Sequence, residues 1–334
     1  MLLSIIISYI LLFLYSHFAK KFGIVDTPSE RRLHKGSVSR GCGVVIAIFC
    51  TIQSFIFYKI YGIEDSFYYA FISILGIFLF VSLVFFIEDI YGINRYVRLV
   101  IQATASIAGT YAIGERAIVV DFLPYFVNFG IVSIGWIWFM NMFNFMDGVD
   151  GMTSTNSLFF IFAILFFCYK IDPHTRSDLM IIMYSLFPMM VVFLIKNWHP
   201  AKMFVGDSGS IGLGFLFGYG MITLQSKVGI LIPTTICSYY LSDSVITIIK
   251  RIINKEDISQ PHCKHYFQIA IRGGLRPRSV IYTISILNLS LFFICYLYFK
   301  IQNPLTFLIC FLFAGFANMI VLKYFRSFER FIKY

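Results

Sequence analysis

Charged residues are scarce in this sequence. Only 13% of its 334 residues are Asp, Glu, Lys or Arg, whereas 59% are hydrophobic and the mean hydropathy is +0.80. Soluble domains carry about 25% charged residues, so this composition excludes an ordinary soluble protein. The first apolar run, residues 2–18, lacks the basic segment and the cleavage site of a signal peptide, and Lys20 and Lys21 follow it. We therefore expect a multi-span membrane protein that retains its first span.

Cysteine patterns typical of metal sites or disulfide frameworks are also missing. The seven cysteines are scattered, mostly inside apolar runs, and no two have CxxC spacing. Such cysteines are typical of small core residues. The sequence has no Gly/Ser linker, no low-complexity tract and no repeat of 20 to 50 residues. We therefore treat residues 1–334 as a single integral membrane domain.

Apolar runs of about 20 residues recur along the whole chain, and each is long enough to span a bilayer as a helix. They are continuous rather than alternating with period two, which favours helices over the strands of a barrel. The candidate spans are residues 1–19, 42–60, 66–87, 97–114, 127–142, 156–171, 178–195, 208–224, 229–249, 279–299 and 304–323. The expected fold is all-α, a polytopic membrane helix bundle with about 11 transmembrane helices.

Lys and Arg residues fall mostly on one side of these spans. With eleven crossings, the loops after the odd-numbered spans hold 21 of the 27 Lys and Arg residues, and the other loops hold 6. The positive-inside rule therefore puts the first set in the cytoplasm, the N-terminus outside and the C-terminus inside. Topology and anionic lipid heads of the bilayer also explain the net charge of +10. Without a soluble basic domain, we expect no nucleic-acid partner.

Acidic residues lie at the expected cytoplasmic ends of the spans. They are Glu88, Asp89, Asp147, Asp150, Asp207 and Asp243. Carboxylates at membrane depth are costly and usually mark function. Two loops rich in basic residues and histidines would lie on the same face. Hard oxygen ligands bind Mg²⁺ together with substrate phosphates, and cationic side chains neutralise the remaining charge. The pattern indicates a metal and a phosphorylated substrate at the cytoplasmic face.

Each motif also has a structural interpretation. In "NFMDGVDG", Asp147 and Asp150 would share a face if the stretch is helical, but a glycine-containing turn with two solvated aspartates explains them equally well. In "GDSGS", Asp207 is either a metal carboxylate at a helix N-terminus or part of an ordinary N-cap before a tightly packed glycine-rich helix.

Two further pairs leave similar alternatives open. Glu88 and Asp89 could supply a general base or a metal ligand, or could simply pair with Arg95 or Arg98. His262 and His265 have too few Cys or His neighbours for a zinc site. They fit a phosphate-binding surface better, because Lys264, Arg272, Arg276 and Arg278 lie nearby in the sequence.

Taken together, the inner loops resemble those of the polyprenyl-phosphate N-acetylhexosamine-1-phosphate transferases. The motifs that carry the resemblance are "NMFNFMDGVDG", "PAKMFVGDSGS" and "HCKHYFQ", and the likeness runs from Asp26 to Leu275. It implies transfer of a sugar 1-phosphate from a UDP-N-acetylhexosamine, such as UDP-GlcNAc, to undecaprenyl phosphate, with release of UMP. It also implies Mg²⁺, with Mn²⁺ as the alternative ion, and a role in O-antigen or a similar surface polysaccharide at the bacterial inner membrane.

The resemblance implies a role for each matching position. Asp207 would be the Mg²⁺ ligand, and Glu88 and Asp89 fall on the family's Asp-Asp pair, which supplies a base or supports the metal. The implied substrate-binding residues are Asn144, Asp147, Asp150, His262, His265, His34, Lys35 and Arg40. Glu88 departs from the usual Asp, and the extra methylene moves its oxygens by about 1.5 Å, so Asp89 carries more weight. Ser39 and Cys42 also depart from the family's first-loop pattern.

A membrane carrier for an anionic nucleotide-sugar would also gather basic residues, and a non-catalytic scaffold for polysaccharide assembly is a third alternative. Carriers bind near the bilayer midplane and often contain inverted repeats. Here the polar groups lie at span ends on one side, which favours the enzyme. The sequence does not decide which N-acetylhexosamine is used or whether two copies form a homodimer.

Overall fold

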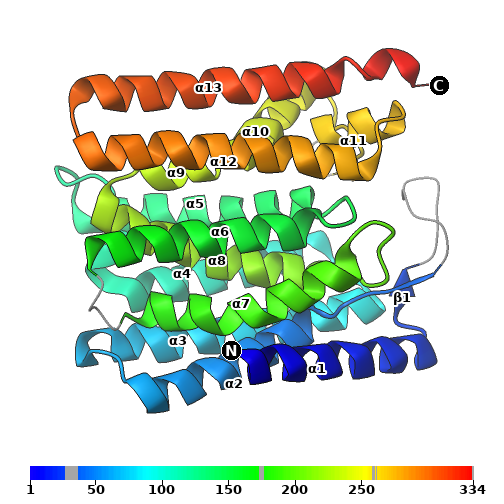
Figure 1. Cartoon of the computed structure of the whole chain (residues 1–334), viewed down its shortest axis with the longest axis horizontal. Coiled ribbons are helices and arrows are strands. Elements are labelled where there is room, and N and C mark those ends of the chain that lie inside the picture. Colours follow the sequence, from blue (N-terminus) through cyan, green and yellow to red (C-terminus); the bar gives the residue numbers. More distant parts are fainter. Residues whose placement is uncertain (27–36, 173–176, 258–259, 261, 333–334) are drawn as a thin grey trace.

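The structure, a computed structural model, describes residues 1–26, 37–172, 177–257, 260 and 262–332. It is 81% helical. The helices in chain order are α1 (Leu2–Lys21), α2 (Gly43–Tyr61), α3 (Asp65–Tyr91), α4 (Arg95–Ile113), α5 (Tyr125–Met146), α6 (Met152–Ile171), α7 (Asp178–Asn197), α8 (Gly206–Val228), α9 (Leu231–Ile236), α10 (Ser238–Ile253), α11 (Tyr266–Arg272), α12 (Pro277–Ile301) and α13 (Pro304–Arg326), with short 3₁₀ turns η1 (Gly114–Ala117) and η2 (Glu329–Phe331). The long helices lie roughly side by side (Figure 1).

Eight of the described helices are long and apolar enough to cross a membrane. They are α1, α2, α3, α5, α6, α7, α12 and the helix that begins at Pro304. Many of their large apolar side chains are exposed, including Ile6, Phe80, Phe293 and Phe316. In water that exposure would be unfavourable, whereas lipid covers it. The expectation of an all-α polytopic membrane protein is confirmed, and the total of eleven crossings stays a prediction.

Helix α8 lies inside the bundle, where it packs against α2, α3, α5 and α6. Its glycines allow these close contacts. A Cβ on Gly43 of α2 would lie 2.0 Å from the backbone nitrogen of Gly209, and a Cβ on Gly218 would lie 2.4 Å from Nε1 of Trp136. The glycine-rich sequence of α8 therefore serves tight helix packing, as one of its two interpretations anticipated.

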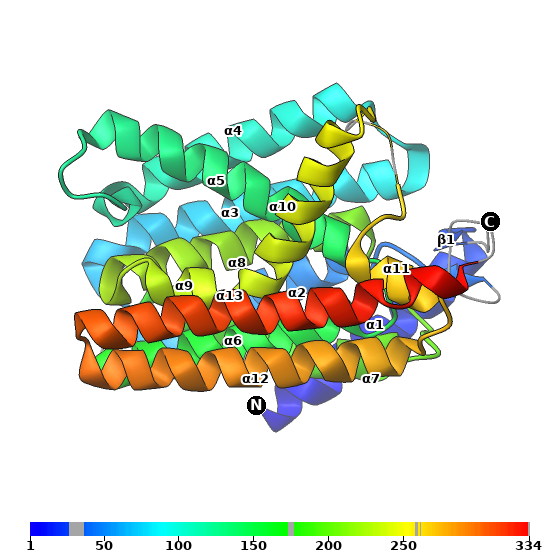
Figure 2. The same cartoon turned by 90° about the horizontal axis from the view of Figure 1, so that it is seen from above.

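The ninth expected span, residues 229–249, is not one helix. It divides at Cys237 into the short α9 and the longer α10, which runs at a steep angle to α12 and α13 (Figure 2). The apolar content of this run concealed an amphipathic pattern: Asp243, Thr247 and Arg251 are buried, while Ile249 and Ile253 are exposed. These polar side chains share one face of α10. That face packs against the rest of the protein, so polar contacts set the orientation of the helix.

Two short strands depart from the all-helical expectation. Val25–Asp26 (β1) pairs antiparallel with Val38–Ser39 (β2), and Ser39 also bridges to Met203 in the segment before α8. The backbone N–H of Phe204 donates to the carbonyl of Ser39 at 2.8 Å. The first loop is thereby attached to the start of α8. β1 and α11 lie toward the same end of the bundle (Figure 1).

Candidate active site

The first turn of α8 is capped by Asp89, which lies in the last turn of α3. Asp89 Oδ1 accepts a hydrogen bond from the N–H of Asp207 at 2.9 Å, and Oδ2 accepts one from the N–H of Ser208 at 3.1 Å. The carboxylate is fully buried and also pairs with Arg40 at 3.0 Å. Gly206 is required here, because it has a φ of +73° and a Cβ would lie 2.4 Å from Asp89 Oδ2. Asp89 therefore fixes the backbone that carries Asp207.

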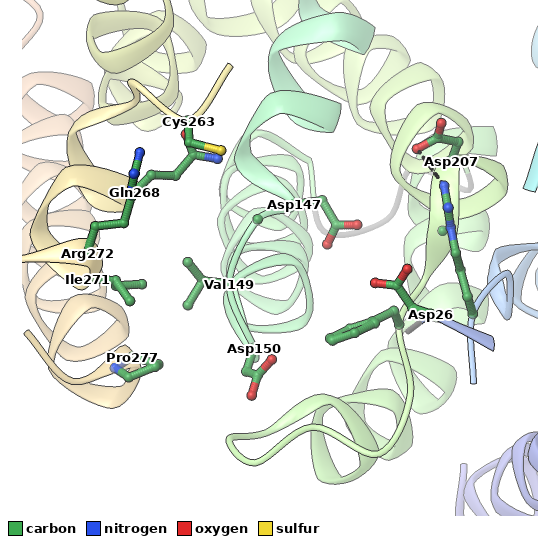
Figure 3. Close-up of a pocket in the computed structure, with 14 residues that line it drawn as sticks. Asp26, Asp147, Val149, Asp150, Asp207, Cys263, Gln268, Ile271, Arg272 and Pro277 are labelled. Carbon is green, nitrogen blue, oxygen red and sulfur yellow. Dashed lines mark ion pairs between the residues drawn. The ribbon is translucent and has the colours of Figure 1, made fainter. Parts of the chain in front are cut away.

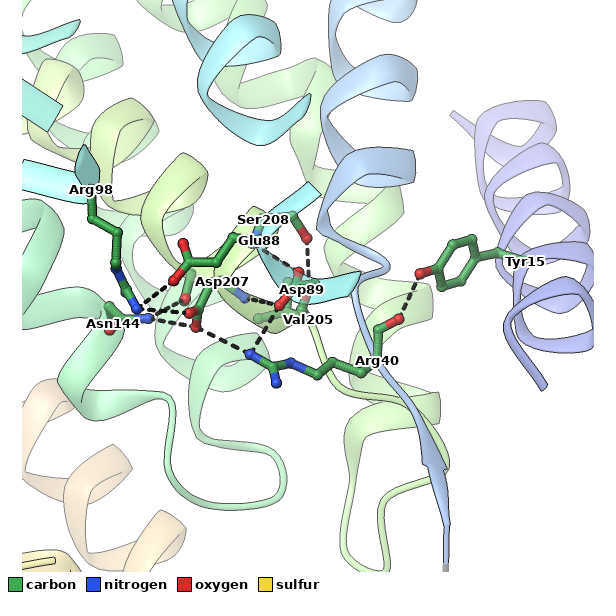
Figure 4. A network of polar contacts seen from close by, with 10 residues as sticks. Tyr15, Arg40, Glu88, Asp89, Arg98, Asn144, Val205, Asp207 and Ser208 are labelled. Carbon is green, nitrogen blue, oxygen red and sulfur yellow. Dashed lines mark hydrogen bonds and ion pairs between the residues drawn. The ribbon is translucent and has the colours of Figure 1, made fainter. Parts of the chain in front are cut away.

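Two arginines hold the Asp207 carboxylate from opposite sides. Arg40 Nη2 lies 3.6 Å from Oδ1, and Arg98 Nη1 lies 3.2 Å from Oδ2 (Figure 4). The same Arg98 nitrogen lies 2.6 Å from Glu88 Oε1, so the pairing of Glu88 with Arg98 is confirmed. The other oxygen, Glu88 Oε2, is buried and has no hydrogen-bond partner among the described residues. Glu88 therefore keeps one oxygen available to accept a proton, whereas both oxygens of Asp89 are occupied.

Asn144, near the end of α5, completes this network. Its Nδ2 donates to Asp207 Oδ1 at 3.1 Å and to the Ser210 hydroxyl at 2.7 Å. One turn earlier, Gln102 and Asn141 exchange a reciprocal pair of hydrogen bonds between α4 and α5. Asn144 therefore orients Asp207.

The stretch containing Asp147 and Asp150 is a turn and not a helix, so the glycine-containing turn is the one of the two interpretations that the structure shows. Helix α5 ends at Met146, and α6 begins at Met152 after Gly151 with a φ of +82°. Thr153 donates a hydrogen bond to Asp147 Oδ1. Burial, followed by repulsion from Asp207, raises the pKa of Asp147 to about 7, although the Thr153 hydrogen bond opposes this shift. Asp147 therefore titrates near neutral pH and lies close enough to Asp207 to interact with it.

Asp150 faces a different segment. Its Oδ2 lies 2.7 Å from His199 Nδ1 and accepts a hydrogen bond from the N–H of Ala201 at 3.0 Å. Arg278, at the start of α12, donates to the carbonyl of His199 at 2.7 Å. These contacts connect the α5–α6 turn with the segment between α7 and α8, and connect that segment with the start of α12.

A cavity of about 240 Å³ lies between these elements (Figure 3). The residues that line it are Asp26, Arg40, Asp147, Gly148, Val149, Asp150, Phe204, Gly206, Asp207, Cys263, Gln268, Ile271, Arg272 and Pro277. Asp207 and Asp26 lie on one side, Gln268 and Arg272 lie on the other, and the Asp147 turn lies between them. The cavity thus has carboxylates and Arg40 on one side, and Arg272 and Gln268 together with the apolar side chains of Ile271 and Pro277 on the other.

The structure brings together most of the residues that the sequence singled out, with differences in position. Arg40, Asp147, Asp150 and Asp207 line the cavity, whereas Glu88, Asp89 and Asn144 lie behind Asp207 in the supporting network. His34 and Lys35 fall outside the described residues, so their predicted phosphate contacts stay predictions.

The two late histidines differ in exposure, and their predicted contacts with substrate stay predictions. His265 is only 2% exposed, and its ring lies between those of Phe145 and Phe267. Burial, followed by the neighbouring His265 and Arg251, lowers the pKa of His262 to about 4. His262 is therefore neutral at pH 7 and supplies no positive charge to a phosphate. Neither histidine is among the residues lining the cavity.

The sequence assigned no role at the site to several residues that the structure places there or in contact with its neighbours, although Arg98 and Asp243 had been named as an ion-pair partner and as an acidic residue at a span end. Asp26 and Gln268 line the cavity, Arg98 bridges two carboxylates, and Asp243 contacts His265. Asp243 had a signal, because it is a carboxylate within an otherwise apolar run. Gln268 is the last residue of the motif "HCKHYFQ", but the sequence assigned it no role of its own.

The oxygen donors at this site fit a magnesium ion that is shared with a substrate. Among the residues that the structure describes, no three His, Cys, Asp or Glu side chains converge to enclose a metal. Mg²⁺ often uses only one or two carboxylates together with water and substrate phosphates. Asp207 and Asp147 line the same cavity and interact electrostatically, so they provide such a set.

Comparison with known proteins gives a family match for the central part of the chain. Residues 71–225 match the family model of glycosyl transferase family 4. This segment contains Glu88, Asp89, Asn144, Asp147 and Asp207, which form the network around the start of α8. The match and the polar network therefore concern the same part of the molecule.

Relatives extend the similarity over most of the chain. A Bacillus subtilis protein named a probable undecaprenyl-phosphate N-acetylglucosaminyl 1-phosphate transferase is 28% identical, over 81% of this chain and 76% of its own length. A Thermotoga maritima undecaprenyl-phosphate alpha-N-acetylglucosaminyl 1-phosphate transferase is 26% identical, over 94% and 98%. A Lactococcus lactis phospho-N-acetylmuramoyl-pentapeptide-transferase is 24% identical, over 78% and 82%. These relatives agree with the family that the loop motifs indicated.

Proposed function

We propose that this chain, which belongs to glycosyl transferase family 4, transfers N-acetylhexosamine 1-phosphate from a UDP-sugar to undecaprenyl phosphate. The products are undecaprenyl-diphospho-N-acetylhexosamine and UMP. The named activities of the Bacillus subtilis and Thermotoga maritima relatives support UDP-GlcNAc as the first donor to examine. The reaction would be the first membrane step of a surface polysaccharide such as O-antigen.

The observation that carries this proposal is the arrangement around Asp207. A carboxylate held between Arg40 and Arg98 lines a cavity that also contains Asp147 and, across from it, Arg272. A diphosphate with a bound cation needs anionic groups that bind the cation and cationic groups that bind the phosphate oxygens. In the absence of substrate, the two arginines neutralise Asp207, and both guanidinium groups can turn to phosphate oxygens when substrate enters.

The chemical step that fits these residues is direct displacement. An oxygen of the lipid phosphate attacks the phosphorus bonded to the sugar, and the bond from that phosphorus to the UMP oxygen breaks. Glu88 lies behind Asp207, with Oε1 paired to Arg98 and Oε2 without a partner among the described residues. When Arg98 turns to a phosphate oxygen, Glu88 would be released to take a proton from the lipid phosphate. When Mg²⁺ is bound at Asp207 and Asp147, it neutralises charge on the diphosphate.

The proposed location is the bacterial inner membrane, with the site at the cytoplasmic face. Arg40 and Arg272, from the two basic segments, line one cavity with Asp147 and Asp207, and the concentration of Lys and Arg in these segments of the sequence supports that end as cytoplasmic. A water-soluble nucleotide sugar and the head of a lipid phosphate can both reach the point where the apolar helices end. The N-terminus would then lie outside.

The test uses the purified full chain with undecaprenyl phosphate, Mg²⁺ and a panel of UDP-GlcNAc, UDP-GalNAc, UDP-QuiNAc and UDP-FucNAc, with UMP release as the measurement. We expect release with at least one donor. Asp207→Asn is expected to abolish release while the protein still inserts and folds. Folded wild-type protein that is inactive with every donor would contradict the proposal, and near-normal activity of Asp207→Asn would remove Asp207 from its assigned role.

A further inference from the structure

Asp243 is a fully buried carboxylate with four hydrogen-bond donors around it. On Oδ1 it meets His265 Nδ1 at 3.0 Å, the backbone N–H of Tyr266 at 3.1 Å and the Thr247 hydroxyl at 3.2 Å. On Oδ2 it accepts from the Tyr239 hydroxyl at 3.2 Å. Two of the four donors belong to α10 itself, and the other two belong to the start of α11.

Neighbouring residues on the same face of α10 reinforce this connection. Lys250 donates to the hydroxyl of Tyr266, and Arg251 Nη2 donates to the carbonyl of Gln260 at 3.2 Å. The polar face of α10 therefore holds both the connecting loop and the first turn of α11.

Helix α11 forms one wall of the cavity. Gln268, Ile271 and Arg272 line it. The opposite wall is close, because a Cβ on Gly148 would lie 3.1 Å from the ring of Phe267 and 3.2 Å from Gln268 Nε2. A small rotation of α11 would therefore change the distance between Arg272 and the Asp147 turn.

The two ends of α11 are fixed by different means. At the C-terminal end, Gly273 packs directly on the backbone of Phe328, where a Cβ would lie 2.2 Å from the carbonyl oxygen. At the N-terminal end, the polar contacts come from Asp243, through His265 and Tyr266, from Lys250, through the Tyr266 hydroxyl, and from the N–H of His265, which donates to Gln268 Oε1 at 3.2 Å. Since His265 is buried between aromatic rings and does not line the cavity, its contacts are with the protein.

We infer that Asp243 and His265 are positioning residues: their hydrogen bond fixes the start of α11 and so sets where Gln268 and Arg272 face the cavity. The inference rests on the proposed function for its substrate, which is the nucleotide sugar. It assigns His265 an indirect role in binding through Nδ1, in place of direct contact with the sugar diphosphate.

The first experiment compares Asp243→Ala with Tyr239→Phe in the full-length protein. Asp243→Ala removes the carboxylate and with it all four hydrogen bonds that it accepts. Tyr239→Phe removes only one of the four donors and leaves the contacts of Asp243 with α11 intact. We expect the KM for UDP-GlcNAc to rise about tenfold or more in Asp243→Ala, with kcat changed much less. Tyr239→Phe should behave like the wild type. Asp243→Glu, which keeps the carboxylate, should recover part of the loss.

The second experiment separates the two nitrogens of His265. An asparagine amide reaches roughly where Nδ1 lies, and a glutamine amide reaches roughly where Nε2 lies. His265→Asn should therefore retain a lower KM than His265→Gln. The opposite order would mean that His265 acts through Nε2 on substrate, and it would overturn the inference.

Hydrogen–deuterium exchange of the segment 264–274 provides a measurement that does not depend on activity. Asp243→Ala should exchange faster in this segment than wild type or Tyr239→Phe, because the N–H of Tyr266 and the first turn lose their acceptor. If Asp243→Ala does not fold, the exchange rates of segment 264–274 are compared between His265→Gln and His265→Asn, and the glutamine variant should exchange faster.

Unchanged exchange in this segment would overturn the inference. A wild type that releases no UMP would instead contradict the proposed function, while the exchange result still judges the role of Asp243.

Discussion

At the residue scale, Glu88 and Asp89 are neighbours in sequence with different surroundings. Both oxygens of Asp89 accept backbone N–H groups of α8, whereas Oε2 of Glu88 has no partner among the described residues. The sequence placed more weight on Asp89, because aspartate is the residue usual in the family. The geometry favours Glu88 for proton transfer and Asp89 for support.

The isosteric pair Glu88→Gln and Asp89→Asn tests this difference. The glutamine NH₂ can take the position of the unpartnered oxygen, and its carbonyl can still accept from Arg98, so the thermal unfolding midpoint should change little. Activity should nevertheless fall by about 100-fold, the typical contribution of a general base. In Asp89→Asn one N–H donor loses its acceptor, which should lower stability by about 1–3 kcal/mol. Thermal unfolding in detergent and UMP release measure the two effects, and equal stability losses would contradict the assignment.

Asp147 gives a prediction about pH. Its pKa is raised to about 7 in the folded protein, while an unfolded aspartate titrates near ~3.9. Between these values the folded state binds a proton that the unfolded state does not, so this group makes stability fall as pH rises from about 4 to about 7. Asp147→Asn cannot ionise and should have a higher unfolding midpoint than wild type at pH 8, in EDTA. The difference should vanish near pH 4, and identical pH profiles of the two proteins would contradict it.

Residue types predicted which side chains line the cavity better than they predicted contacts. Asp207, Asp147, Asp150 and Arg40 were identified from motifs, and all of them line the cavity. The part played by Asp243 was missed, because a lone carboxylate in an apolar run does not reveal that its partner is 22 residues later in the chain. Such partners are set by tertiary packing.

At the element scale, helices with a uniform apolar composition were predictable and the exceptions were not. The spans expected at 42–60 and 304–323 agree closely with α2 and α13, because continuous apolar runs have few alternatives in a bilayer. The prediction of one continuous span over residues 229–249 was wrong. This run combines Pro233, a break at Cys237 and an amphipathic helix whose polar side faces the rest of the protein. Average hydropathy does not record which face of a helix is polar.

The crossing of α2 and α8 is expected to be sensitive to a single methyl group. In Gly43→Ala the new Cβ would meet the backbone of Gly209, which cannot move aside as a side chain can. We expect a loss of about 3 kcal/mol in stability, and of activity, since the start of α8 carries Asp207. Gly130→Ala in α5 is the control, because nothing lies within 4 Å of its Cβ and alanine is the better helix former. An unfolding midpoint of Gly43→Ala equal to that of Gly130→Ala would contradict this.

At the scale of the whole molecule, one cavity joins residues from Asp26 to Pro277. The clustering of Lys and Arg predicted that several loops share one face, but it did not say which loops touch. Contacts such as Ser39 with Met203, and Gly148 with Phe267, depend on how the helices pack and on the small β1–β2 pairing. The family match over residues 71–225 and the cavity together support a transferase whose site is assembled from distant loops.

In the proposed reaction the sugar moves together with a phosphate. The most direct test supplies UDP-GlcNAc labelled with ³²P at the β-phosphorus, the one bonded to the sugar, to purified protein with undecaprenyl phosphate and Mg²⁺. If a different UDP-sugar is the donor, the same label is placed in that sugar nucleotide. The label should enter the lipid fraction, and unlabelled UMP should be released in equal amount. Label that remains in released UDP would show transfer of the sugar alone and would contradict the transfer of a sugar 1-phosphate.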